Sequence, residues 1–196
     1  RHNNEEWAKA LMQLGDDWYE IRELACAQRA YEELQQAVKG AEKELSDRYQ
    51  PYIWARLGDV YRESGMPDKA LSRYHFATPY QHERPEIACY IHDRMGDIYI
   101  EKGDFENAGR ICQENLEICK ERMSRETSIE CYKSLINAFL KAGDVLLAQE
   151  NISEAREQYN QALLTARQMS QEICQDIHGP EILCGVALCL RKLGDA

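Results

Sequence analysis

The sequence of 196 residues is 44% hydrophobic and 30% charged, a composition typical of soluble folded proteins and not of disordered ones. Its 24 basic and 34 acidic residues give a net charge of −10, which argues against nonspecific binding to nucleic acid or to an anionic membrane and leaves basic partners open. The longest apolar stretch, Ile182–Leu190, is far shorter than the roughly 20 residues that span a bilayer.

One short phrase recurs along the chain. The stretch WARLGDVY at Trp54–Tyr61 returns as HDRMGDIY at His92–Tyr99, and weaker copies occur elsewhere. Each copy contains a Gly-Asp pair, and the glycines of these pairs are spaced by 38 to 51 residues: Gly15, Gly58, Gly96, Gly143 and Gly194. Self-similarity at a period of roughly 20–50 residues indicates a solenoid or another array of repeats.

The first two repeats are each predicted to contain two helices, over about residues 4–46 and 51–78. In the second repeat, Gly65 is expected to cap the first helix, and Pro67 to begin the second. We expect the first helix to begin near Pro51. The core positions recur at helical spacing: Leu11, Leu14, Gly15, Trp18, Ala27, Tyr31 and Leu34, then Trp54, Leu57, Gly58, Tyr61, Ala70, Tyr74 and Ala77.

The third and fourth repeats are predicted over about residues 85–123 and 126–177, and a partial repeat over 180–196. Pro85 and Pro180 lie where first helices are expected to begin. The fourth repeat allows two registers, because Tyr132, Leu135, Ile136 and Phe139 also fit the pattern; we prefer the one that contains Gly143. The core positions are His92, Met95, Gly96, Tyr99, Ala108, Cys112 and Asn115, then Phe139, Ala142, Gly143, Leu146, Ala155, Tyr159 and Ala162.

The second repeat carries the pattern W-x2-L-G-x2-Y, a turn, and A-x3-Y-x2-A, and by it the chain resembles the tetratricopeptide repeat (TPR) proteins. The resemblance implies an all-α fold, a TPR-like helical-hairpin solenoid that winds as a right-handed superhelix of about four and a half repeats. The long spacing is similar to that of Leu-Gly-Asn-repeat G-protein signalling modulators, kinesin light chains and rapsyn. We expect the closest helix crossing between Gly58 and Ala70, with Trp54 and Tyr74 beside it.

Acidic residues recur on one face of the first helices. The family resemblance places the residue after each Leu-Gly pair, and the residue four later, on the concave wall of the array. A ladder of carboxylates is therefore predicted there, to bind a basic or amphipathic segment of another protein: Asp16, Glu20, Asp59, Glu63, Asp97, Glu101 and Asp144. Like charges at i, i+4 destabilise an isolated helix by a few tenths of a kcal/mol, which suggests that another group offsets their repulsion.

A structural explanation of this ladder remains open. A base lies three residues before the aspartate in four repeats, so that i, i+3 ion pairs would satisfy the carboxylates internally: Arg56, Arg94, Lys141 and Lys192. The Leu-Gly-Asn scaffolds have asparagine at this position, and aspartate accepts hydrogen bonds but cannot donate them. Tyr52 and Tyr90 are either aromatic anchors for the partner or packing residues, and Tyr19 and Arg62 are weaker members of the same set.

Other site chemistries find little support. The eight cysteines form no CxxC motif and no disulfide framework, which indicates a reducing compartment, the cytosol or the nucleus. Cys112 and Cys119 fit core positions, as does His92, so that His75, His82, Cys89 and His92 make a poor zinc site. No phosphate-binding loop, HExxH motif or nucleophile elbow is present, and we predict neither an enzyme nor a cofactor.

We therefore predict a scaffold or adaptor that binds another protein; the alternative is a peptide-sensing TPR regulator. The chain lacks an initiator methionine and ends part-way through a repeat, so we expect it to be part of a longer protein. In the partial repeat, apolar residues lack a covering second helix, which predicts self-association through this segment: Leu183, Val186, Leu190 and Leu193.

Overall fold

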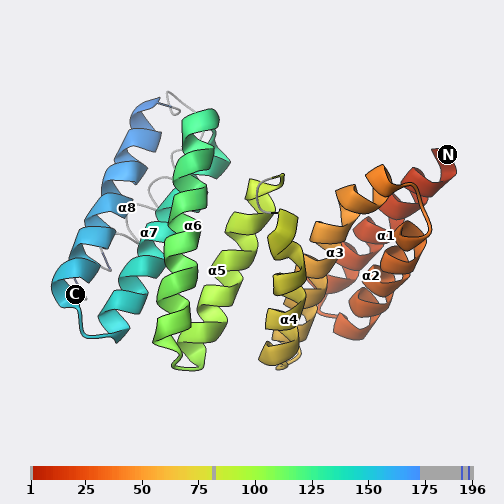
Figure 1. Ribbon diagram of the computed structural model, residues 1–196, viewed down its shortest axis with the longest axis horizontal. Coiled ribbons are helices and arrows are strands. Elements are labelled where there is room, and N and C mark those ends of the chain that lie inside the picture. The colour runs from red at the N-terminus through yellow and green to blue at the C-terminus, as the bar shows by residue number, and fades with distance from the viewer. Residues whose placement is uncertain (1, 81–82, 173–190, 192–193, 195–196) are drawn as a thin grey trace. The chain divides into compact units, whose positions relative to one another are not determined.

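The computed structural model describes residues 2–80, 83–172, 191 and 194, and the described residues form α-helices joined by short turns (Figure 1). No strand occurs among them, which confirms the predicted all-α class. The chain divides into two compact units, residues 1–87 and 88–196. None of the described helices is both long enough and apolar enough to cross a membrane.

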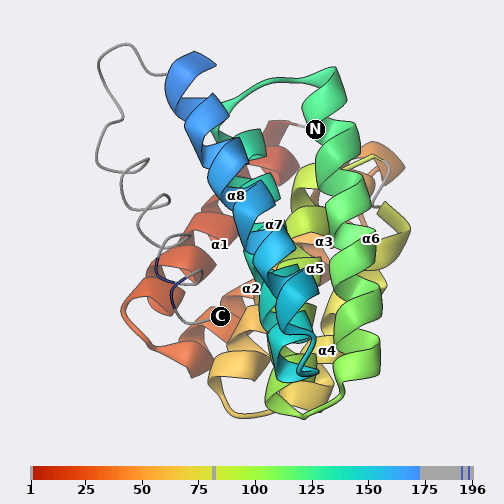
Figure 2. The same cartoon turned by 90° about the vertical axis from the view of Figure 1, so that its left-hand side faces the viewer.

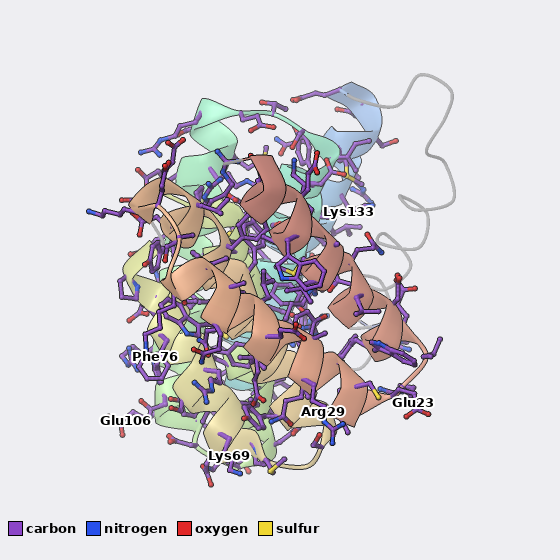
Figure 3. The ribbon with its side chains drawn as sticks, turned by 90° about the vertical axis from the view of Figure 1, so that its right-hand side faces the viewer. Glu23, Arg29, Lys69, Phe76, Glu106 and Lys133 are labelled. Carbon is purple, nitrogen blue, oxygen red and sulfur yellow. The ribbon has the colours of Figure 1, made fainter. Side chains whose placement is uncertain are left out.

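The first unit contains two helical hairpins. Helices α1 (His2–Glu20) and α2 (Leu24–Lys39) pack together, as do α3 (Lys43–Glu63) and α4 (Pro67–Ala77), and α2 also packs on α3. A 3₁₀ turn, η1 (Thr78–Tyr80), follows α4. Figure 3 shows the side chains of this unit, with Arg29 of α2 and Lys69 of α4 at its surface. Its core contains large buried side chains from α2, α3 and α4: Tyr31, Leu34, Ile53, Leu57 and Tyr74.

The turn between α3 and α4 follows the sequence prediction. Gly65 has a φ of +72°, a left-handed conformation that favours glycine, and the amide of Met66 donates to the carbonyl of Tyr61, which closes the helix end. Pro67 occupies the first turn of α4. The predicted start of α3 is wrong, because the helix begins at Lys43 and Pro51 lies inside it. The buried face of α3 continues on the N-terminal side of Pro51, where it includes Tyr49.

Helix α5 (Pro85–Glu101) begins at a proline as predicted, and from Ala88 onward it belongs to the second unit. Helices α6 (Phe105–Arg125), α7 (Ile129–Ala148) and α8 (Ile152–Glu172) follow, and α7 packs on both α6 and α8 (Figure 2). Side-chain caps begin α6 and α7, where Asp104 and Ser128 accept from backbone amides in the first turn. The buried residues of this unit include Leu116, Ile136, Phe139, Tyr159 and Ala162.

The partial repeat predicted at 180–196 lies almost wholly outside the described residues, and with it the apolar set predicted to self-associate. The buried positions of Cys112, Cys119 and His92 agree with the core roles predicted for them. The preferred register of the fourth repeat is supported, because Gly143 lies against the ring of Tyr159.

Candidate functional site

In three of the repeats, a tyrosine ring from the second helix packs on the Gly-Asp pair of the first helix. Each ring is fully buried, and a Cβ atom added to the glycine would lie only 2.3–2.4 Å from the nearest ring atom. The prediction that Ala70 makes the closest contact with Gly58 is wrong, because Tyr74, one turn later, covers the glycine. The three pairs are Gly15 with Tyr31, Gly58 with Tyr74, and Gly143 with Tyr159.

The tyrosine hydroxyl donates to the aspartate that follows the glycine. The O–O distances are 2.7 Å from Tyr31 to Asp16, 2.8 Å from Tyr74 to Asp59, and 2.8 Å from Tyr159 to Asp144. Burial and the neighbouring carboxylate raise the pKa of Tyr31, so this hydroxyl stays a donor. In these three repeats the aspartate therefore holds the tyrosine that joins the two helices.

We expect Tyr74→Phe to lower the free energy of unfolding by about 1–3 kcal/mol, because Asp59 is 1% exposed and loses a hydrogen bond that water cannot replace. Tyr31→Phe should cost less, since the side chain of Asp16 is 31% exposed. Chemical unfolding of the two variants measures the difference. Equal losses would show that the burial of the carboxylate does not set the cost.

The third repeat departs from this arrangement, because Cys112 stands where the others have tyrosine. Gly96 is correspondingly less crowded, and an added Cβ would have its nearest contact, the Cγ of Lys141, at 3.6 Å. The carboxylate of Asp97 instead accepts a hydrogen bond from Lys141 of α7, whose Nζ also lies 3.6 Å from Asp93. Lys141 thus joins α7 to two carboxylates one turn apart on α5.

The charges in this cluster are partly removed from water. Burial raises the pKa of Asp93, against the lowering effect of Lys141. For Lys141, burial alone would lower the pKa, but Asp93, Asp97 and Asp144 together raise it, so the lysine keeps its charge. Lys141 therefore interacts with three carboxylates of the second unit, and Arg94 lies 3.8 Å from two of them, Asp93 and Asp97.

A base plays a similar part in the first unit. Arg56 of α3 lies 2.9 Å from Asp16 of α1 and 3.6 Å from Asp59 on its own helix. The predicted i, i+3 pairs are thus confirmed for Arg56, and also for Arg94 with Asp97 at 3.8 Å. Arg56, however, lies closer to Asp16 of the preceding repeat than to Asp59, and Lys141 donates to Asp97 of the preceding repeat. The sequence analysis did not consider these pairs between repeats.

The other predicted binding residues are dispersed over each unit. Glu20 and Glu101 are exposed at the ends of α1 and α5, and Glu63 pairs with Arg22 at 2.5 Å and with Arg62 at 3.2 Å. Three tyrosines are half-buried: Tyr19 on α1, Tyr52, which donates to Glu86 at 3.3 Å, and Tyr90, whose ring centroid is 5.0 Å from the guanidinium of Arg94.

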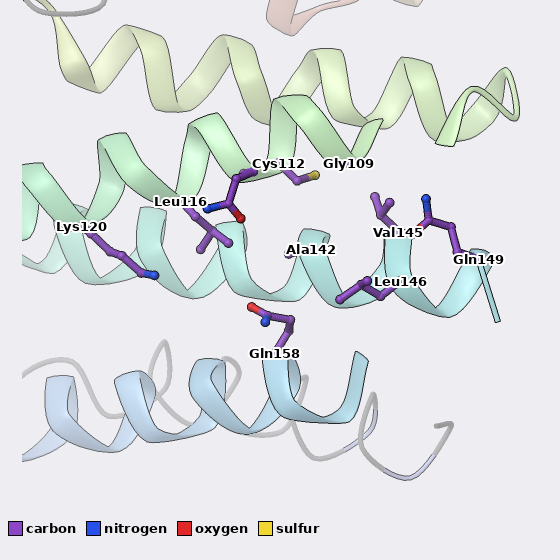
Figure 4. Close-up of a pocket in the computed structure, with 10 residues that line it drawn as sticks. Gly109, Cys112, Leu116, Lys120, Ala142, Val145, Leu146, Gln149 and Gln158 are labelled. Carbon is purple, nitrogen blue, oxygen red and sulfur yellow. The ribbon is translucent and has the colours of Figure 1, made fainter. Parts of the chain in front are cut away.

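Two features were missed by the sequence analysis. Asp93 was not considered, although its i, i+4 spacing from Asp97 was a detectable signal. A pocket of about 180 Å³ between α6, α7 and α8 contains none of the predicted partner-binding residues (Figure 4). Glutamine amides and apolar side chains line it, among them Gln113, Gln158, Leu116 and Val145. Within the described ranges, no group of three His, Cys, Asp or Glu side chains is placed to hold a metal.

The repeat geometry agrees with a comparison to known protein families. A family model described as MalT-like TPR region matches residues 5–178. No curated protein matches the chain. The N-terminal domain of stress-induced protein-1 (STI-1) from C. elegans aligns with a TM-score of 0.49 and 18% identity, covering 71% of this chain and 94% of that chain. The MamA protein aligns with a TM-score of 0.40 and 15% identity, covering 88% and 98%.

Proposed function

Because the chain belongs to the family of MalT-like TPR regions, and is thus a TPR protein as its repeat pattern predicted, we propose that it is a non-enzymatic scaffold that binds a basic or amphipathic segment of another protein. TPR folds generally serve as protein-interaction scaffolds, and the finer proposal concerns the charge of the partner. The observation that carries it is that bases are shared among more numerous carboxylates. Arg56 lies between Asp16 and Asp59, and Lys141 and Arg94 lie among three aspartates: Asp93, Asp97 and Asp144.

A lysine or arginine from a partner would add a further cation to such a cluster, in which the carboxylates outnumber the bases. In the second unit, the side chains of Asp93 and Asp97 remain 23% and 26% exposed, so that a ligand reaches them without unfolding the helix. The exposed Glu20 and Glu101 add to the negative potential, which raises the local concentration of cations in a chain of net charge −10.

Aromatic side chains beside the carboxylates would supply contact area. Tyr90 lies one turn before Arg94 on α5, and Tyr52 lies one turn before Arg56 on α3. Both are half-buried, and tyrosine is enriched among the residues that dominate binding energy. We propose that charge selects the partner and speeds its association, whereas these two tyrosines anchor it, in the cytosol or the nucleus.

The test uses two amphipathic peptides of one design, with lysines and arginines on the polar face of the first and glutamates in their place on the second. We expect the basic peptide to bind and to weaken as salt rises, because screening acts on exposed charges. Fluorescence anisotropy at low and high ionic strength measures both. Binding of the acidic peptide alone, or of neither, would overturn the proposed partner chemistry.

Paired variants separate a local effect from net charge. Glu20→Gln with Glu101→Gln should weaken binding of the basic peptide severalfold and reduce its salt dependence. The control, Glu33→Gln with Glu117→Gln, removes the same charge from exposed positions on the second helices α2 and α6. Equal effects of the two pairs would mean that the first-helix carboxylates have no special role.

A further inference from the structure

Two buried cysteines face each other in the second unit. Cys89 of α5 and Cys119 of α6 are separated by 30 positions in the chain, yet their sulfur atoms are only 3.1 Å apart. Both side chains are in the core, at 5% and 1% exposure. The Sγ of Cys119 also lies 3.6 Å from Oδ1 of the buried Asn115, a contact that helps to fix its position.

The separation is below the van der Waals contact of two sulfur atoms and about 1 Å longer than a disulfide bond, which measures about 2.05 Å. Two thiols that the fold holds this close need little backbone movement to become bonded. None of the proposed partner-binding residues uses either sulfur, so this pair is independent of the proposed function.

We propose that Cys89 and Cys119 are an oxidative modification site, at which a hydroperoxide converts the two thiols to a disulfide between α5 and α6. The thiolate of Cys89 attacks the distal peroxide oxygen and becomes a sulfenic acid, while the O–O bond breaks and the other oxygen leaves as water or an alcohol. The thiol of Cys119 then attacks the sulfenic sulfur and expels water. Two thiols are oxidised by two electrons, and one peroxide is reduced.

The burial of the pair determines when it reacts. The hydrogen bond with Cys89 and burial both raise the pKa of Cys119, so Cys119 stays the protonated donor of the pair and Cys89 is the sulfur that attacks. In the closed structure, burial also keeps a peroxide away from both sulfur atoms. Cys89, however, is in the second turn of α5, and helix ends open at low free-energy cost. The site therefore responds to sustained oxidation, and the bond, once formed, closes a loop of about 30 residues and stabilises the unit.

The experiment treats the whole protein with hydrogen peroxide, alkylates the remaining thiols under denaturing conditions, and maps the non-reduced peptides by mass spectrometry. We expect the dominant cross-link to join Cys89 to Cys119, and the number of titratable thiols to fall by two. The melting temperature of the second unit should rise by about 5–10 °C, and a reductant should reverse this rise. A dominant cross-link between other cysteines, or none, would overturn the proposal.

Two alanine variants sharpen this result. Cys112→Ala removes another buried thiol of α6 and should leave both the cross-link and the thermal shift unchanged. Cys89→Ala should abolish both. If Cys89→Ala still gained the same thermal shift on oxidation, the stabilising bond would lie elsewhere and the proposal would be wrong. The peptide map of the unsubstituted protein decides the question even where a variant fails to fold.

Discussion

Replacing Gly58 with alanine is expected to lower the free energy of unfolding of the first unit by about 3 kcal/mol. The new Cβ would lie 2.3 Å from Cε1 of Tyr74, and the buried ring cannot move aside without breaking its hydrogen bond to Asp59. Overpacking of a core crossing typically costs about 1–3 kcal/mol, and the lost hydrogen bond adds to it. All three tryptophans lie in the first unit, so tryptophan fluorescence during urea unfolding reports this loss.

The third repeat supplies the matched control. Gly143→Ala in the second unit should be as damaging as Gly58→Ala, because Tyr159 covers that glycine in the same way. Gly96→Ala, in the same unit, meets atoms no closer than 3.6 Å and gains helix propensity, so we expect an unchanged or slightly higher stability. Hydrogen exchange of α5 to α8 compares the two. A large loss for Gly96→Ala would show that glycine is needed for a reason other than the ring.

The repeat pattern predicted the helices well because it reports local physical requirements. A glycine in the middle of a helix is unfavourable, and five glycines at similar positions indicated a recurring close contact. The residue that makes the contact was less accessible to sequence reasoning. Ala70 was expected because small residues favour close helix crossings, whereas the atoms nearest to Gly58 belong to the ring of Tyr74.

The partners of the aspartates were predictable only within one helix. The i, i+3 spacing gave the pair of Arg56 with Asp59, but the tyrosine that binds Asp59 is on the next helix, and the arginine that binds Asp16 is in the next repeat. Such contacts depend on how the helices pack, which spacing in a single helix does not describe. The predicted ladder of carboxylates therefore contains residues that serve the fold, whereas Glu20 and Glu101 are among its exposed members.

Replacing Lys141 with methionine should destabilise the second unit by about 2–4 kcal/mol at neutral pH. Removing one partner of a buried ion pair costs about 3–5 kcal/mol, and we expect somewhat less because the lysine side chain is 18% exposed. Asp93 and Asp97 would remain as two carboxylates one turn apart without this cation. Urea unfolding followed by circular dichroism measures the loss, with the exposed Lys133→Met on the same helix as the control (Figure 3).

The pH dependence of this loss identifies its cause. The pKa of Asp93 is already raised above its usual value of 3.8, and removal of Lys141 would raise it further. A carboxyl whose pKa is higher in the folded state binds its proton more tightly there, so lowering the pH through that pKa favours folding. The deficit of Lys141→Met relative to the unsubstituted protein should therefore shrink as the pH falls from 7 toward about 4.

A rescue distinguishes charge from packing. Asp93→Asn with Asp97→Asn should restore most of the stability of Lys141→Met, because amide side chains then replace the two carboxylates and carry no charge at any pH. In the unsubstituted background, the same two changes remove the acceptors of the lysine and should not have this benefit, which a double-mutant cycle expresses as a coupling free energy. A deficit that neither low pH nor the two asparagines relieves would mean that Lys141 acts through the packing of its methylene groups against Gly96, and not through its charge.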